Sequence, residues 1–261
     1  MLKQLLGVYE AGLVNRDTPK CLFPETLIFN EGWLLRLVLR EWLAGSGGSQ
    51  FGFLPFPEGV TAYSEGQLYT PFKARSRGDK LAESHTHVDG IVGEFSISGT
   101  KSGIELKPDF RYIAAFEAKI FSRIAPGVTN TPGFDQVSRT AACLINSVLL
   151  AQPQASYSAH LVVLYAKKNR HFHPAAYGKD RIEDKIAQRL QPFTATAERS
   201  DAIVRFSAGW RYILERLKVH FLTWEDVLAG ICSDELSEFY KLCRQFNGGP
   251  STAAVAGELR S

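Results

Sequence analysis

The sequence predicts an α/β protein built on one mixed β-sheet flanked by helices. Three observations predict this class. Residues 27–44 carry apolar side chains at helical spacing, residues 87–121 read as strands separated by short turns, and residues 159–165 form a continuous apolar run typical of a strand buried on both faces. No linker requires a second domain, so residues 1–246 are expected to form a single domain and residues 247–261 a loose C-terminal tail.

The N-terminal half opens with the helix expected over residues 27–44. Asn30 is its predicted N-cap, and the glycine-rich segment 45–48 is expected to end it. Residues 50–84 are rich in loop signals and indicate no ordered element with clarity. Strands are expected at 87–98, 103–107 and 111–121, with GTKSG and KPDF as the turns between them.

The C-terminal half opens with a predicted helix. Thr131 is its expected N-cap, Pro132 its first helical residue, and it should run to about Leu150. The buried strand at 159–165 follows, then helical patterns at 180–191 and 200–217 and a short strand at 218–223. Thr223 and Asp226 fit a capping box that leads into a further helix.

Composition and charge narrow the class of protein. The 261 residues carry a net charge of +3, too small a value to indicate a polyanionic partner by itself. The four cysteines are scattered and read as reduced packing residues, not as a disulfide frame or zinc site. Without a signal peptide or a membrane-spanning run, the expected compartment is the cytoplasm, with no membrane partner; homodimerisation is left open.

The stretch AAFEAKIFS at residues 114–122 places two opposite charges within an apolar strand. Because side chains alternate across a strand, Glu117 and Lys119 project from one face while Phe116 and Ala118 face a core. One interpretation is an ion pair on a half-exposed strand, which contributes little. The other is a metal-binding carboxylate beside a lysine that stabilises a developing anion.

Several motifs together resemble the PD-(D/E)XK nuclease superfamily. They are Glu31 in a first helix, an aspartate before the hairpin return, EAKIFS at 117–122, Asn130, and DQVSRTAAC at 135–143. The resemblance covers roughly residues 27–165, and the combination is more specific than the ExK tripeptide alone. It implies a restriction-endonuclease-like fold and a nuclease that hydrolyses phosphodiester bonds in nucleic acid, with DNA favoured, using Mg²⁺ or Mn²⁺.

The chemistry of phosphodiester hydrolysis suits these residue types. Magnesium prefers carboxylate and water oxygens, so Glu117 is expected to be a metal ligand. Lys119 would orient or deprotonate the attacking water and stabilise charge on the phosphate. The resemblance implies a second carboxylate, for which Asp89 and Asp109 are the candidates.

The expected strand register favours Asp89 over Asp109. Asp109 belongs to a Pro-Asp turn and is too far along an extended chain to share an ion with Glu117. Perfect pairing around a turn near Lys101 would set Asp89 opposite Ile113. The extra KPDF excursion slides the register and brings Asp89 towards Glu117.

Three further residues are candidates for the site. Glu31 is either a first-turn acid that interacts with the helix dipole or, as the resemblance implies, a residue that holds a metal-bound water or a second ion. Gln136 shares a helix face with Thr140 and is expected to hydrogen-bond Lys119 or the water. Arg139 contacts a phosphate or belongs to an ordinary polar face.

Other segments leave alternatives open. Lys167, Lys168 and Arg170 either grip a phosphate backbone or form a solvated strand end. His85, His87 and Asp89 would share one face of an extended strand and could bind zinc or iron. The rival functions are therefore a non-catalytic nucleic-acid-binding module of a defence or repair assembly and a transition-metal enzyme.

Overall fold

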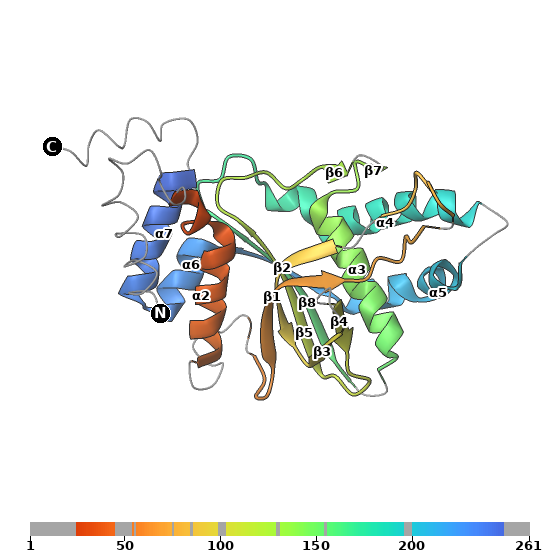
Figure 1. Cartoon of the computed structure of the whole chain (residues 1–261), viewed down its shortest axis with the longest axis horizontal. Helices are drawn as coiled ribbons and strands as arrows, with labels where there is room; N and C mark the ends of the chain where they lie inside the picture. Colours follow the sequence, from red (N-terminus) through yellow and green to blue (C-terminus); the bar gives the residue numbers. More distant parts are fainter. Residues whose placement is uncertain are drawn as a thin grey trace.

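The computed structural model describes residues 25–44, 54, 56–74, 76–83, 86–98, 103–128, 131–153, 156–195 and 200–247. Within these ranges, a mixed seven-stranded sheet in the order β3-β4-β1-β2-β5-β8-β9 is flanked by six α-helices. The predicted class, a mixed sheet flanked by helices, is confirmed (Figure 1).

The sheet combines antiparallel and parallel pairs. β2 pairs antiparallel with β1 and with β5, while β5, β8 and β9 run parallel. The hairpin of β3 and β4 extends the sheet beyond β1, and β6 and β7 form a separate small ladder. The strand bounds are β1 Thr61–Leu68, β2 Thr86–Gly93, β3 Phe95–Ser98, β4 Gly103–Leu106, β5 Tyr112–Lys119, β6 Gly127–Val128, β7 Thr131–Pro132, β8 Ser158–Tyr165 and β9 Lys218–Thr223.

Helices cover both faces of the sheet (Figure 1). One face carries α2 (Glu31–Ala44), α6 (Trp224–Ile231) and α7 (Asp234–Asn247), and the other carries α3 (Gln136–Ala151), α4 (Lys179–Thr194) and α5 (Asp201–Arg216). Short 3₁₀ turns occupy Glu25–Leu27 and Pro174–Tyr177. Two apolar cores result, one between the sheet and each helix layer.

Alternation along β5 divides its side chains between the two cores. Ala114, Phe116 and Ala118 face the α2 side, whereas Ile113 and Ala115 face α3. Because both faces are covered, every residue of β5 is buried.

Two helix starts agree with the sequence and one does not. The side chain of Asn30 accepts a hydrogen bond from Trp33 N at 2.9 Å, and that of Thr223 accepts from Asp226 N at 3.1 Å, so both predicted caps are confirmed. The predicted start at Thr131 and Pro132 is wrong, because these residues form β7. Asp135 caps α3 instead, accepting from Ser138 N at 2.9 Å.

β1, like the short strands β6 and β7, was not indicated by the sequence. Its alternation slips, since Tyr63 and Leu68, of opposite parity, both pack against the α3-side core. Between them Glu65 has a left-handed φ of 56°, which breaks the two-residue period.

Several expectations fall on residues that the structure does not describe. The glycine-rich helix end at 45–48, most of the GTKSG turn, and residues 248–261 of the expected tail lie outside the described ranges. Among the residues that are described, none of the helices has the length and apolar character needed to cross a membrane.

Candidate active site

The candidate site lies where β2 and β5 separate. The two strands pair from Gly93 and Ile113 to Gly90 and Phe116, while residues 86–88 of β2 continue in register with β1. Continued one step past its last pair, Gly90 with Phe116, the β2–β5 register aligns Asp89 with Glu117. Asp89 Oδ2 accepts a hydrogen bond from Ala118 N at 2.7 Å. The Asp89 side chain therefore supplies the hydrogen-bond partner of this β5 main-chain N–H where the β2–β5 ladder ends.

Glu94 fixes this register. It separates β2 from β3, and its carboxylate accepts hydrogen bonds from Arg111 N at 2.5 Å and Arg111 Nη2 at 2.8 Å. Its main-chain oxygen also accepts from Lys107 N, at 3.3 Å. These contacts hold residues 107–111 as an excursion between the β3–β4 pairing and the β2–β5 pairing. The predicted register shift is therefore present, and it brings Asp89 to Glu117.

Two side chains of α3 hold the Glu117 carboxylate. Glu117 is fully buried, with 0% exposure. Gln136 Nε2 donates to its Oε2 at 2.5 Å, and Thr140 Oγ1 donates to its Oε1 at 2.6 Å. Gln136 was expected to bond Lys119 or a water; its partner here is Glu117. The spacing of four residues puts both donors on one helix face, as predicted.

The environment of Glu117 favours its protonated form. Burial, and then the nearby charge of Asp89, raise the pKa of Glu117 to about 8 from its usual 4.5. The charges of Lys119 and Arg139 and the Thr140 hydrogen bond oppose this shift in the pKa. A cation placed between the two carboxylates would reverse the balance, because it favours both ionised forms.

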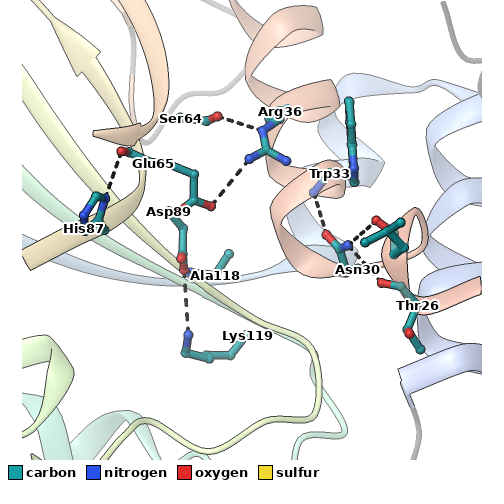
Figure 2. A network of polar contacts seen from close by, with 11 residues as sticks. Thr26, Asn30, Trp33, Arg36, Ser64, Glu65, His87, Asp89, Ala118 and Lys119 are labelled. Atoms are coloured by element: carbon teal, nitrogen blue, oxygen red, sulfur yellow. Dashed lines mark hydrogen bonds and ion pairs between the residues drawn. The ribbon is translucent and has the colours of Figure 1, made fainter. Parts of the chain in front are cut away.

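Lys119 lies beside Asp89 at the same place, the point where β2 and β5 separate, called the fork below. Its Nζ is 3.7 Å from Asp89 Oδ2, and the residue is 8% exposed. Figure 2 shows the Lys119 side chain reaching towards the carboxylate that also contacts Ala118. The main chain of Lys119 is fixed as well, because Trp224 Nε1 donates to its oxygen at 3.1 Å.

The interpretation of Glu117 and Lys119 as an ion pair on a half-exposed strand is wrong. All of β5 is buried, and the ion pair of Lys119 in the described chain is with Asp89. The helix layer of α3 covers the face that a simple alternation pattern leaves open to solvent.

Asp109 lies away from this cluster. It is exposed in the loop between β4 and β5, where Arg111 is its electrostatic neighbour. From Tyr112, the first residue of β5, to Glu117 the strand advances about 17 Å. The literal Pro-Asp pair is thus at the opposite end of the strand from Glu117.

Glu31 lines a groove whose other lining residues begin at Phe121, two residues beyond Lys119. Ser122 Oγ donates to Glu31 Oε1 at 3.3 Å, and Asn169 Nδ2 donates to Ser122 O at 3.2 Å. The groove has a volume of about 490 Å³ and is also lined by Lys168, Arg170 and His171.

The other predicted phosphate contacts are placed differently. Lys167 is exposed, and its main-chain N–H donates to Glu225 Oε2 at 2.9 Å. Arg139 is half-buried on α3, and its Nε is shielded from solvent with no hydrogen-bond partner among the described residues. Burial raises the pKa of Glu83 and that of Glu117, and the positive charge of Arg139 opposes both rises, which places the guanidinium in the neighbourhood of the site.

The histidine alternative is partly outside the described residues, because His85 is not among them, and neither is Asn130. His87 is exposed, and its Nδ1 lies 3.3 Å from the main-chain oxygen of Glu65. Across the described ranges, no three or more His, Cys, Asp or Glu side chains gather as a metal-binding group.

Sequence reasoning missed the contributions of Ser122 and Asn169. Their contact joins the loops that follow β5 and β8, which are 47 residues apart in the chain. The parallel pairing of these strands aligns Lys119 with Tyr165, so both loops leave the same edge of the sheet. A sequence-based prediction that paired β5 and β8 in parallel would have placed Ser122 and Asn169 at the same edge of the sheet.

The donor set at the fork fits a hard divalent cation. Asp89 and Glu117 offer carboxylate oxygens, the ligands that Mg²⁺ prefers, and each oxygen keeps a lone pair beyond the hydrogen bond it accepts. Two carboxylates suffice for Mg²⁺, which usually completes its coordination with water and phosphate oxygens. Comparison of the chain with protein-family models, curated proteins and solved structures finds no match.

Proposed function

We propose that the protein is a metal-dependent nuclease of the restriction-endonuclease-like class that hydrolyses phosphodiester bonds, with DNA as its substrate. The observation that carries the proposal is the meeting of Asp89, Glu117 and Lys119 at the fork between β2 and β5. The chain order of these residues, and of Glu31 and Gln136, is the order that the PD-(D/E)XK resemblance requires.

Asp89 and Glu117 would hold Mg²⁺ or Mn²⁺. When bound, the ion would supply Lewis acidity towards a phosphate oxygen and lower the pKa of a water molecule. Glu117 must lose its proton for this purpose, and Gln136 and Thr140 keep its carboxylate oriented throughout.

Lys119 would act on the substrate and not on the ion. Its ammonium, 3.7 Å from Asp89 Oδ2 and largely shielded from water, would stabilise negative charge that develops on the phosphate. The adjoining groove would hold the neighbouring nucleotides, with Lys168 and Arg170 as phosphate contacts.

The proposal is tested by incubating the protein with single- and double-stranded DNA and RNA, with Mg²⁺ or with EDTA. We expect DNA cleavage with Mg²⁺ that disappears in EDTA and in the Glu117→Ala variant. A folded wild-type protein that cleaves none of the substrates, or a Glu117→Ala variant that cleaves as well as wild type, would overturn it. A silent protein that still retards DNA in a gel would identify a binding module instead.

A further inference from the structure

A second hollow lies at the far end of α3 from the candidate active site. The last turns of α3, the segment that precedes β8 and one face of α5 enclose a groove of about 800 Å³. The residues that matter here are Val148, Leu149, Tyr157, Arg205, Tyr212 and Arg216. Val148 follows Gln136 by twelve residues of α3, which is about 18 Å along a helix axis. The two sites are therefore separate.

Among the described residues, the positive charge in this groove has no acidic partner. None of the described residues that line it is Asp or Glu. Arg205 makes no ion pair within the described chain, and its Nε is shielded from solvent without a hydrogen-bond partner there. Arg216 donates through Nη1 to the main-chain oxygen of Tyr212 at 3.1 Å. Guanidinium groups without a neutralising carboxylate favour an anionic ligand.

Arg211 shows the contrast on the same helix. Its Nε pairs with Glu183 Oε1 at 3.2 Å, outside the groove. The absence of such a partner for Arg205 and Arg216 is thus a local property of the groove and not of α5 as a whole.

Aromatic surface lies next to the two arginines. Tyr212 is 57% exposed, and the guanidinium of Arg216 is 3.5 Å from its ring centroid. The hydroxyl of Tyr157 is shielded from solvent and has no hydrogen-bond partner among the described residues. Val148 and Leu149 supply apolar wall. An inorganic anion would leave this aromatic and apolar surface exposed to water. A ligand that carries a planar ring as well as the anionic group would cover it.

We propose that this groove binds a nucleoside phosphate. The phosphate lies against Arg205 and Arg216, with the Tyr157 hydroxyl as a further donor, and the base lies against Tyr212. The groove volume is within the range usual for small-molecule sites. The same chemistry is offered by a free mononucleotide and by one nucleotide of a longer strand. This inference does not depend on the proposed hydrolase activity.

The experiment is calorimetric titration of the full chain in EDTA, which keeps metal from the candidate active site. The probes are the four ribonucleoside 5′-monophosphates, inorganic phosphate, adenosine and a short oligodeoxyadenylate. We expect saturable one-to-one binding of at least one monophosphate, tighter than that of phosphate or adenosine. Arg205→Gln should weaken it by at least about tenfold, because a hydrogen bond to a charged group is lost.

Matched variants locate the ligand. Tyr212→Ala should weaken nucleotide binding while leaving inorganic phosphate binding unchanged. Because Tyr212 is exposed, this variant should fold normally and keeps the test decisive if Arg205→Gln does not fold. Arg211→Gln removes the same charge from the same helix and should bind as wild type. Oligonucleotide binding that is tighter than monophosphate binding and is weakened by Arg205→Gln would identify a strand as the natural ligand of this groove, and weaker binding a free nucleotide. The proposal fails if no monophosphate saturates the protein at millimolar concentration, or if folded Arg205→Gln and Tyr212→Ala bind it as wild type does.

Discussion

Asp89 and Glu117, 28 residues apart in the sequence, each directly follow the last β2–β5 pair, Gly90 with Phe116, where the two strands part. Asp89 Oδ2 accepts from Ala118 N at 2.7 Å, while Gln136 Nε2 donates to Glu117 Oε2 at 2.5 Å. Burial first, and the negative charge of Asp89 second, raise the pKa of Glu117 to about 8, which favours its protonated form near neutral pH in the metal-free protein. The predictions below follow from this arrangement.

Asp89 and Asp109 should differ in their effect on catalysis. Asp89→Asn keeps an oxygen for the Ala118 N–H but removes a metal-binding charge, so Mg²⁺ affinity should fall and turnover should drop on the order of a hundredfold. Asp109→Asn changes an exposed loop residue and should remain within about twofold of wild type. Steady-state cleavage and Mg²⁺ titration measure both. A larger defect in Asp109→Asn than in Asp89→Asn would mean that the metal site is built around the Pro-Asp turn.

Lys119→Met should separate catalysis from metal binding. Methionine keeps most of the apolar stem and removes the ammonium, so Mg²⁺ binding should survive while turnover falls by about a hundredfold or more. The control is Lys218→Met, which removes an exposed lysine at the start of β9 and should leave turnover intact. An unfolded Lys119→Met protein, judged by circular dichroism, would instead assign Lys119 a structural role.

Glu117 should make the metal-free protein less stable as the pH rises. Its folded-state pKa of about 8 exceeds the usual 4.5, so the folded protein retains a proton that the unfolded chain loses. The contribution of this bound proton to the free energy of unfolding is complete below about pH 4.5 and is lost as the pH rises to about 8. The free energy of unfolding falls by no more than about 1.4 kcal/mol per pH unit in this range. Urea unfolding in EDTA at several pH values measures this free energy of unfolding, and the Glu117→Gln variant should lack this pH dependence.

Comparing wild type with Glu117→Gln also cancels the effect of a second titrating group, His160, on the pH dependence of stability. Burial lowers the pKa of His160 to about 4, and therefore stability falls as the pH decreases from about 6.5 to about 4. This contribution is the same in both chains and cancels in their difference. If the two chains lose stability in parallel between pH 5 and 8, Glu117 is not the group that titrates.

Lys168 and Arg170 should contribute to DNA binding through phosphates. Replacing both with glutamine should weaken binding to all sequences alike and reduce the salt slope of the affinity by about 2, roughly 0.9 for each lost contact. Fluorescence anisotropy at several salt concentrations measures this slope. Lys241→Gln, an exposed lysine of α7 paired with Glu238 at 3.0 Å, is the control. An unchanged slope in the double variant would place the DNA elsewhere.

Much of the secondary structure was determined by local sequence. Asn30 and Thr223 cap their helices as predicted, and the apolar run at 159–165 became the buried strand β8. The alternation around Glu117 correctly put it on the same strand face as Lys119. These features depend on neighbours within a few residues, and for that reason they can be read from the chain.

Some local signals competed, and the sequence did not show which would prevail. Thr131 and Pro132 carry a helix-start signal, yet Asp135 caps α3 because its side chain reaches Ser138 N and its other oxygen pairs with Lys185 of α4. In β1 the left-handed Glu65 conceals the strand period. The choice in each case depends on contacts with distant elements.

The tertiary structure alone decided what surrounds each charged residue. Alternation gives the face of a strand but not what covers it, so burial of Glu117 under α3 and its bonds to Gln136 and Thr140 had to come from packing. The register that sets Asp89 opposite Glu117 depends on Glu94 and Arg111, and the grooves join loops and helices far apart in sequence. A periodic pattern carries no information about such contacts, because their energy depends on two segments that meet only in the folded chain.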